Sequence, residues 1–489
     1  MNYTKQVAKG TAALFVSSVL TALLGYFFRV YLARTFSPYE YGLFFSVFAL
    51  VTTIVPFKDF GLAVTIMRYI PEFIVKKQHS KIKDSLFFLF VFQTVIYGIG
   101  LIVVVLLSKY LATNFFHDDS ARLLLIVLAI AFMFSTFHSI FNSTNIGFEQ
   151  IGTYAFFQVA FSAVVIIALH LLNVPSLNIA NAAWAYLISY FLTSFAQIFI
   201  FVKTVPNFFR KPKLNKNLIK ELFGFSKFYF FASTAKNFFF NNGTHILTYL
   251  SGMESVAYFN VAMPTANFIR FIFKPFSIMM LRVSSEVNTI NKKLIQKPLN
   301  AVFRYFFVMF FPVVIFTYFV SDRVIVLLYG EKYAAAAFSF VVLVAGNMIV
   351  SMIDVNSNIM LGMKKPKESM IVSLIMLFVN AVLCFILIPR LSYLGASIAF
   401  TIASMIGLIY SLFAIEIISS FISGILDYIK ITLGGMLLFF FMKRLMIPSL
   451  NYFQIAGLIV FSGIVYLGYI FALRIVTMKE IEDNLRKIF

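Results

Sequence analysis

The sequence predicts an all-α integral membrane protein of about fourteen transmembrane helices. Of its 489 residues, 61% are hydrophobic and only 12% are charged. Because a soluble domain carries about 25% charged residues to solvate its surface, this composition excludes a cytosolic enzyme. The single cysteine, Cys384, also excludes an intrachain disulfide or a cysteine-based metal site. The apolar residues exceed what one core can bury, so many of them must face lipid.

A transmembrane helix needs about 20 mostly apolar residues, and this length picks out about fourteen segments. The first apolar stretch, residues 11–33, is too long for the apolar core of a signal peptide, which spans about 7–15 residues, so we expect a retained helix. In chain order the predicted segments are 10–33, 41–67, 85–110, 121–147, 153–172, 179–202, 222–250, 255–281, 301–320, 334–361, 368–388, 394–418, 429–446 and 453–476.

The basic residues predict the orientation. The chain has 40 Lys and Arg against 19 Asp and Glu, a net charge of +21. This sum could indicate nucleic-acid binding, but the basic residues form short clusters between apolar runs. With the N-terminus in the cytoplasm, 27 of them lie in or beside inner loops and 8 in or beside outer loops. Because basic loops stay inside, we expect a multi-pass protein of the cell membrane with both termini cytoplasmic.

A weak internal repeat predicts the domain organisation. Tyr-Gly-Leu-Phe at residues 41–44 opens the second segment, and Val-Ala-Tyr-Phe at 256–259 opens the eighth. Six helices per copy give both copies the same orientation, an arrangement typical of transporters. We expect two pseudo-symmetric six-helix bundles plus a C-terminal helix pair. The expected parts are an N-terminal lobe at 1–202, a basic cytoplasmic linker at 203–221, a second lobe at 222–418, and the last two helices with a cytoplasmic tail at 419–489.

Five basic residues fall inside the predicted segments. Each costs about 2.5–3.5 kcal/mol at the bilayer centre unless it faces a bundle interior or a wet cavity. The acidic residues at similar depth, Asp59 and Asp354, are too few to neutralise them all, so an anionic ligand is the simplest partner. The predicted cationic, substrate-binding residues are Arg29, Lys58, Lys236, Arg270 and Lys274.

Polar side chains follow one face of several segments at helical spacing. Such stripes either line a hydrated interior or form interhelical hydrogen bonds. Arg270 and Lys274 share a stripe, which favours a lumen, whereas Lys236 projects away from the stripe of its own segment. The predicted polar lining consists of Asn260, Asn267, Asn237, Asn241, His138 and Asn142.

A further stripe carries Asp354 with Asn347 and Asn358. Asp354 could bind a coupling cation, Na⁺ or H⁺, or could be the counter-ion of a neighbouring Lys or Arg. No His, Cys or carboxylate spacing predicts a metal site. No phosphate-binding loop or dinucleotide fingerprint occurs, so we expect no cofactor.

Several short motifs resemble one family. They are SPYEYGLF at 37–44, DFGL at 59–62 running to Arg68, YGEKY at 329–333 and LGAS at 394–397. Together with the helix pattern along essentially the whole chain, they resemble the polysaccharide transporters, the O-antigen and lipid-linked oligosaccharide flippases of the MATE-like (MOP) exporter superfamily.

This resemblance implies an alternating-access carrier. It would move a polyprenyl-(pyro)phosphate-linked oligosaccharide from the cytoplasmic to the outer leaflet, for the assembly of cell-surface glycans. The resemblance also implies that Arg29, Lys58, Arg270 and Lys274 line a central cavity, and that the last two helices guide the lipid tail. The partners would be the glycan lipid, membrane lipids and a possible coupling cation, but no nucleic acid.

Two other functions compete with this one. A multidrug or cation exporter of the same superfamily would need an acidic, aromatic cavity, whereas these stripes are net basic. A polytopic glycan polymerase or ligase would need a large outer catalytic loop, and no predicted outer loop is long enough. The sequence therefore predicts a transporter and not an enzyme.

Overall fold

A computed structural model describes residues 3–206, 208, 216–290, 296–415, 425–446 and 451–475, and these residues form helices, turns and loops without a β-strand. Much of the predicted basic linker, at 207 and 209–215, lies outside the described residues, as does the predicted tail at 476–489. Eleven helices of the described part are long and apolar enough to cross a membrane. The all-α membrane fold is thus confirmed, while the number fourteen stays a prediction.

The contacts divide the chain into two compact units. Unit 1 comprises residues 1–261 and 381–396, and unit 2 comprises residues 262–380 and 397–489. This division assigns residues 222–261 to the first unit, whereas the predicted lobes follow the internal repeat and stay a prediction.

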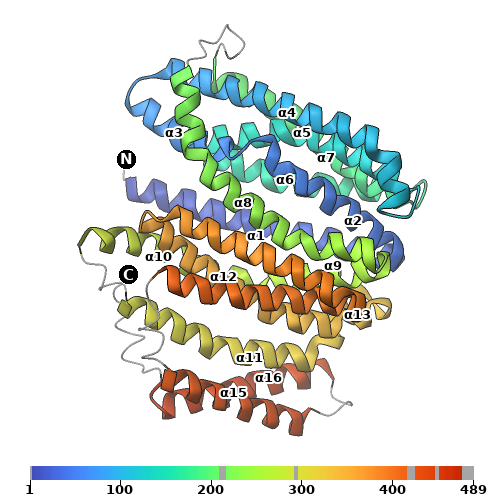
Figure 1. Cartoon of the computed structure of the whole chain (residues 1–489), viewed down its shortest axis with the longest axis vertical. Coiled ribbons are helices and arrows are strands. Elements are labelled where there is room, and N and C mark those ends of the chain that lie inside the picture. Colours follow the sequence, from blue (N-terminus) through green and yellow to red (C-terminus); the bar gives the residue numbers. More distant parts are fainter. Residues whose placement is uncertain are drawn as a thin grey trace. The chain divides into compact units, whose positions relative to one another are not determined.

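The helices of the first unit follow one another closely in the chain. Figure 1 shows α4, α5, α6 and α7 running alongside one another. The elements are α1 (Tyr3–Thr35), α2 (Pro38–Ile54), the 3₁₀ turn η1 (Val55–Lys58), α3 (Leu62–Val75), α4 (His79–Asn114), α5 (Ala121–Gly147), α6 (Ile151–Asn173), α7 (Ala180–Thr204), α8 (Lys216–Leu250) and the first part of α9 (Met253–Asn267).

The second unit begins within α9. In it, α10 packs against α12, and α11 packs against α12 and α15 (Figure 1). The elements are α10 (Ile269–Ile290), α11 (Gln296–Tyr329), the 3₁₀ turn η3 (Glu331–Ala336), α12 (Ala337–Gly362), α13 (Pro366–Ala414), α15 (Ile425–Leu445) and α16 (Tyr452–Ala472); part of α13 belongs to the first unit.

Two boundaries differ from the sequence prediction, and a third break agrees with it. The single segment predicted at 41–67 is wrong, because α2 ends at Ile54 and α3 starts at Leu62. The segment predicted at 255–281 is likewise divided into α9 and α10. The break predicted between the segments 368–388 and 394–418 is present within α13, which consists of two helices that meet at a kink at Ser392 (φ 50°). The second helix runs back along the first, because Tyr410 Oη donates a hydrogen bond to Glu368 Oε2 at 3.2 Å.

The break after α2 has clear local causes. Pro56 lies in η1 and interrupts the α-helical hydrogen bonds. Phe60 and Gly61 then take positive φ angles of 48° and 76°, which reverse the chain before α3. Asp59 Oδ1 accepts the Gly61 N–H at 2.8 Å and stabilises this turn.

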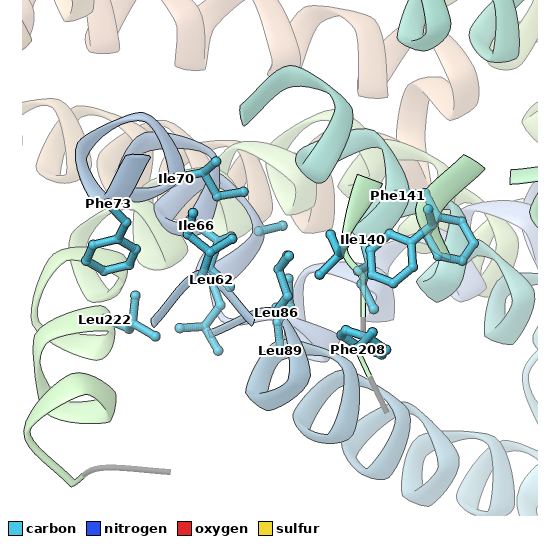
Figure 2. Close-up of a cluster of buried hydrophobic side chains, with 14 of the residues drawn as sticks. Leu62, Ile66, Ile70, Phe73, Leu86, Leu89, Ile140, Phe141, Phe208 and Leu222 are labelled. Atoms are coloured by element: carbon cyan, nitrogen blue, oxygen red, sulfur yellow. The ribbon is translucent and has the colours of Figure 1, made fainter. Parts of the chain in front are cut away.

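A hydrophobic cluster fixes the short helix that follows the break. Figure 2 shows α3 presenting one apolar face to side chains of α4, α5 and α8. Its labelled residues are Leu62, Ile66, Ile70, Phe73, Leu86, Leu89, Ile140, Phe141, Phe208 and Leu222. Burying a Leu, Ile or Phe side chain contributes about 1.5–3 kcal/mol, so this cluster holds the adjacent η1 turn, and Lys58 with it, in place.

The motifs of the sequence have structural roles here. Ser37 caps α2: its hydroxyl accepts the Glu40 N–H at 3.2 Å, and Glu40 in turn accepts the Ser37 N–H at 3.0 Å. Gly42 allows close packing in the first unit, because a Cβ there would lie 1.8 Å from the Met253 carbonyl oxygen.

Candidate functional site

Lys58 lies in the interior of the first unit. Its side chain is buried, and Nζ donates a hydrogen bond to Ser135 Oγ of α5 at 2.9 Å. The η1 turn that carries Lys58 packs against α2, α4 and α8, so the ammonium points into the helix bundle and not toward lipid. An ammonium held this way keeps its charge at membrane depth only at a cost, and Ser135 offsets part of that cost.

The polar stripe of α5 also faces the interior. His138 and Asn142 are buried, and His138 Nδ1 lies 3.1 Å from Gln197 Nε2 of α7. The His138 ring also packs against Phe161 and Tyr190. The structure thus connects this stripe to α6 and α7 by hydrogen bonding and ring packing.

Arg29 lies over an aromatic ring. Its guanidinium carbon is 4.1 Å from the centre of the Phe45 ring, within the range of a cation–π interaction. The side chain is half-buried, and Nη1 makes no hydrogen bond with the described residues. A guanidinium in this position can still receive an acceptor in its plane while its face stays on Phe45.

The amides predicted on α8 and α9 make hydrogen bonds within α8 and between the two helices. Asn241 Nδ2 donates to Asn237 Oδ1 at 3.2 Å, and Asn260 Nδ2 donates to Thr244 Oγ1 at 3.0 Å. These contacts correspond to the interhelical and local hydrogen bonds that the sequence left open as an alternative. Lys236, on the same helix, is half-buried.

The second unit contains an ion pair at the start of α10. Arg270 Nη2 lies 2.7 Å from Asp354 Oδ2 of α12, and Nη1 donates to Asn267 Oδ1 at 3.1 Å. Lys274, one turn further along α10, is exposed, with Nζ 6.0 Å from the Phe271 ring centre. The structure therefore brings together three predicted residues, and Asp354 takes the counter-ion position in it.

The two amides on the stripe of Asp354 make hydrogen bonds to α10 and within α12. Asn358 Nδ2 donates to Ser277 Oγ at 2.7 Å and to its carbonyl oxygen at 3.0 Å. Asn347 is buried, and its Nδ2 donates to the Leu343 carbonyl oxygen at 2.9 Å. In the part of the chain that the structure describes, no group of three or more His, Cys, Asp or Glu could hold a metal ion.

Comparison with known proteins decides the family. Residues 7–280 match the polysaccharide biosynthesis protein family, which is more than half of the chain. This chain belongs to that family. The resemblance noted in the sequence is thereby confirmed, and this member of the polysaccharide biosynthesis protein family is a multi-pass membrane protein.

One curated relative covers the whole molecule. An uncharacterized membrane protein of Methanocaldococcus jannaschii is 26% identical, over 100% of this chain and 99% of its own. The similarity to this membrane protein therefore extends over the full length of the chain.

Solved structures show which fold the family member has. The lipid II flippase MurJ in an inward closed conformation superposes with a TM-score of 0.71 at 18% identity, covering 93% of this chain and 97% of that one. An inward-facing multidrug resistance MATE transporter of the MOP superfamily gives 0.64 at 16% identity, over 83% and 98% of the two chains. A MOP superfamily transporter from Pyrococcus furiosus gives 0.57 at 14% identity, over 84% and 96%. The chain thus has the fold of MOP transporters.

Some polar residues of the family member were not predicted from the sequence. Gln197, which contacts His138, is one amide in an apolar run and belongs to no stripe. Gln93 is fully buried on α4, and neither of its side-chain polar atoms has a hydrogen-bond partner among the described residues. Its isolation in an apolar segment was the only available signal.

Proposed function

We propose that this protein is a flippase for a polyprenyl-(pyro)phosphate-linked oligosaccharide. It carries the sugar diphosphate from the cytoplasmic to the outer leaflet by alternating access while the prenyl chain stays in lipid. A sugar diphosphate cannot cross hydrocarbon alone, because burying its uncompensated charge is prohibitive. Basic side chains at membrane depth replace the water that the phosphates lose.

The observation that carries the proposal is the guanidinium of Arg270. It lies in a helix of a membrane protein, its side chain is 23% exposed, and it is oriented by Asn267 and Asp354. A guanidinium presents N–H groups in a planar fork that matches phosphate oxygens. With Lys274 exposed one turn away, α10 offers two positive charges to one diphosphate.

The other predicted cations contribute to substrate binding in different ways. Arg29 contributes a second guanidinium, held on Phe45. Lys236 adds a half-buried ammonium on α8. Lys58 would reach the substrate only when its hydrogen bond to Ser135 opens, so we assign it to a later stage of transport than Arg270.

The finer features follow the same proposal. The two six-helix lobes at 1–202 and 222–418 alternate their access, the basic linker at 203–221 joins them in the cytoplasm, and α15 and α16, in the predicted last part of the chain, guide the prenyl tail. The protein resides in the plasma membrane, and both of its termini lie in the cytoplasm.

The membrane potential contributes to the direction of transport. An inside-negative potential favours outward movement of an anion by roughly 2.3 kcal/mol per charge per 100 mV. A coupling cation, Na⁺ or H⁺, therefore serves the return of the empty carrier.

A multidrug exporter is the second candidate, because MATE transporters share the fold. A cation exporter would have to place a cationic drug beside Arg270 and Lys274, where it would be repelled. The basic side chains therefore favour the flippase. A fold shared with transporters also favours transport over glycan polymerisation or ligation.

Reconstitution tests the proposal. Purified protein is placed in liposomes with a fluorescent polyprenyl-diphosphate glycan, and the fraction reached by an impermeant quencher is followed over time. We expect wild-type protein to expose the inner-leaflet lipid and Arg270→Ala to abolish this activity. Arg304→Ala is the matched control, since Arg304 of the same unit lies 4.0 Å from its carboxylate partner Asp427. Export of ethidium without movement of the glycan lipid would reject the flippase.

A further inference from the structure

The carboxylate of Asp354 forms an ion pair with Arg270, the guanidinium that we propose binds the substrate phosphate. Its Oδ2 atom lies 2.7 Å from Arg270 Nη2, and the two side chains are 25% and 23% exposed. An ion pair sealed in a core would be inaccessible to a ligand, whereas these exposed fractions leave both groups within reach of one. Arg270 Nη1 also donates to Asn267 Oδ1 at 3.1 Å, so the arginine is anchored by the last residue of α9.

The ion pair is not needed to hold its two helices together. Asn358 of α12 donates to Ser277 of α10 through two hydrogen bonds, at 2.7 and 3.0 Å. Further along, Gly362 approaches α10 so closely that a Cβ would lie 2.8 Å from the Leu281 carbonyl oxygen. Because these contacts fix α10 against α12, Arg270 can exchange its partner by side-chain rotation while the helices stay packed.

From these contacts we infer that Asp354 is an internal competitor of the substrate phosphate for Arg270, and that it determines which lipids the carrier accepts. This inference rests on the proposed function. Carboxylate and phosphate oxygens accept the same charge-assisted hydrogen bonds from a guanidinium, so one must leave when the other binds. No covalent step is involved.

Competition of this kind has two consequences. In the empty carrier, Asp354 neutralises Arg270, so the guanidinium is not left as an uncompensated charge within the helix bundle. A neutral prenyl lipid cannot displace the carboxylate, whereas a diphosphate, with more charge and more acceptor oxygens, can. The displaced carboxylate then repels the bound phosphate and favours its release.

The test measures binding of geranylgeranyl diphosphate to the purified full-length protein in detergent, with geranylgeraniol as the uncharged probe. We expect Asp354→Asn to bind the diphosphate at least about tenfold more tightly. In this variant, no carboxylate has to leave Arg270 before the phosphate can bind. Binding of the alcohol should not change. The matched control is Asp427→Asn, which removes an equal charge beside Arg304 in the same unit and should leave diphosphate affinity as it is.

The outcomes separate competition from a structural role. A structural ion pair would make Asp354→Asn lose thermal stability and diphosphate affinity together, whereas competition lowers the unfolding temperature and raises the affinity. Asp354→Ser provides a second variant if the Asn protein is not monodisperse. Equal or weaker binding by both variants, with normal binding by wild type, would overturn the inference and leave the flippase intact. If wild type prefers geranylgeraniol or binds both probes equally, the proposed function itself fails, and this inference with it.

Discussion

The ammonium of Lys58 donates a hydrogen bond of 2.9 Å to the hydroxyl of Ser135, which lies 77 residues later in the sequence. This bond joins the break between α2 and α3 to the middle of α5, within the first unit. It also satisfies one of the three N–H donors of a buried ammonium. The pair therefore offers a direct way to separate the structural and transport roles of an embedded charge.

Replacing Lys58 with Met should keep the protein folded and stop transport. Methionine fills a similar volume without a charge to desolvate, so the unfolding temperature in detergent should equal or exceed that of wild type. Flipping of a fluorescent polyprenyl-diphosphate glycan in liposomes should fall to background.

Ser135→Ala is the complementary variant. It leaves the buried ammonium without this acceptor and should lower stability by about 1–3 kcal/mol, and the double variant should recover that loss. Unchanged flipping by Lys58→Met would assign Lys58 a structural role alone.

Gly42 should tolerate no side chain. A Cβ at this position would lie 1.8 Å from the Met253 carbonyl oxygen and 3.2 Å from the Ala257 nitrogen, and both are backbone atoms. Overpacking of this kind costs about 1–3 kcal/mol or more, so Gly42→Ala should unfold at a clearly lower temperature.

Gly25→Ala supplies the control for this substitution, because nothing lies within 4 Å of a Cβ there. In the middle of α1 it should stabilise the helix by up to about 1 kcal/mol. Thermal unfolding followed by circular dichroism measures both variants, and equal stability of the two would contradict the close approach.

The sequence predicted the regular helices well because apolar length is a local property. The segment predicted at 121–147 coincides with α5. The breaks were harder to predict. Pro56 lies at the first break, but the positive φ of Phe60 depends on tertiary packing. Pro264, three residues before the end of α9 at Asn267, was a signal for the second break that the prediction did not use. Prediction failed at the first break because packing, rather than composition, decides the backbone conformation of Phe60.

The candidate site shows the same limit. Helical spacing placed Arg270 and Asn267 on one stripe and Asp354 on another. It could not tell whether Asp354 bound a cation or an arginine, because the two charges are 84 residues apart. That choice depends on how α10 packs against α12. The hydrogen bond between Asn358 and Ser277 belongs to the same packing.

Asn358 should act on stability more than on cation coupling. Its amide nitrogen already donates to Ser277 Oγ at 2.7 Å. Asn358→Ala should therefore destabilise the protein by about 0.5–1.5 kcal/mol and leave the Na⁺ or H⁺ dependence of flipping as in wild type. Unfolding temperature and flipping at several Na⁺ concentrations and pH values measure the two effects. A lost cation dependence with normal stability would instead make Asn358 a ligand of the coupling ion.

Arg29 should be sensitive to shape as well as charge. Its guanidinium carbon lies 4.1 Å from the Phe45 ring centre, and a planar guanidinium can stack on a ring and still offer N–H groups at its edge. Lysine keeps the positive charge but has no plane to stack. We therefore expect Arg29→Lys to flip the glycan lipid about three- to tenfold more slowly, as the loss of roughly 0.7–1.4 kcal/mol of cation–π and fork interactions requires.

A double-mutant cycle with Phe45→Leu isolates the ring contribution. Phe45→Leu alone should slow flipping by a similar factor, and adding it to Arg29→Lys should cost little more, because the stacking has already been lost. Arg29→Leu removes charge and plane together and should abolish flipping. Additive effects of Arg29→Lys and Phe45→Leu would contradict the stacked geometry, since independent sites add and contacting residues do not.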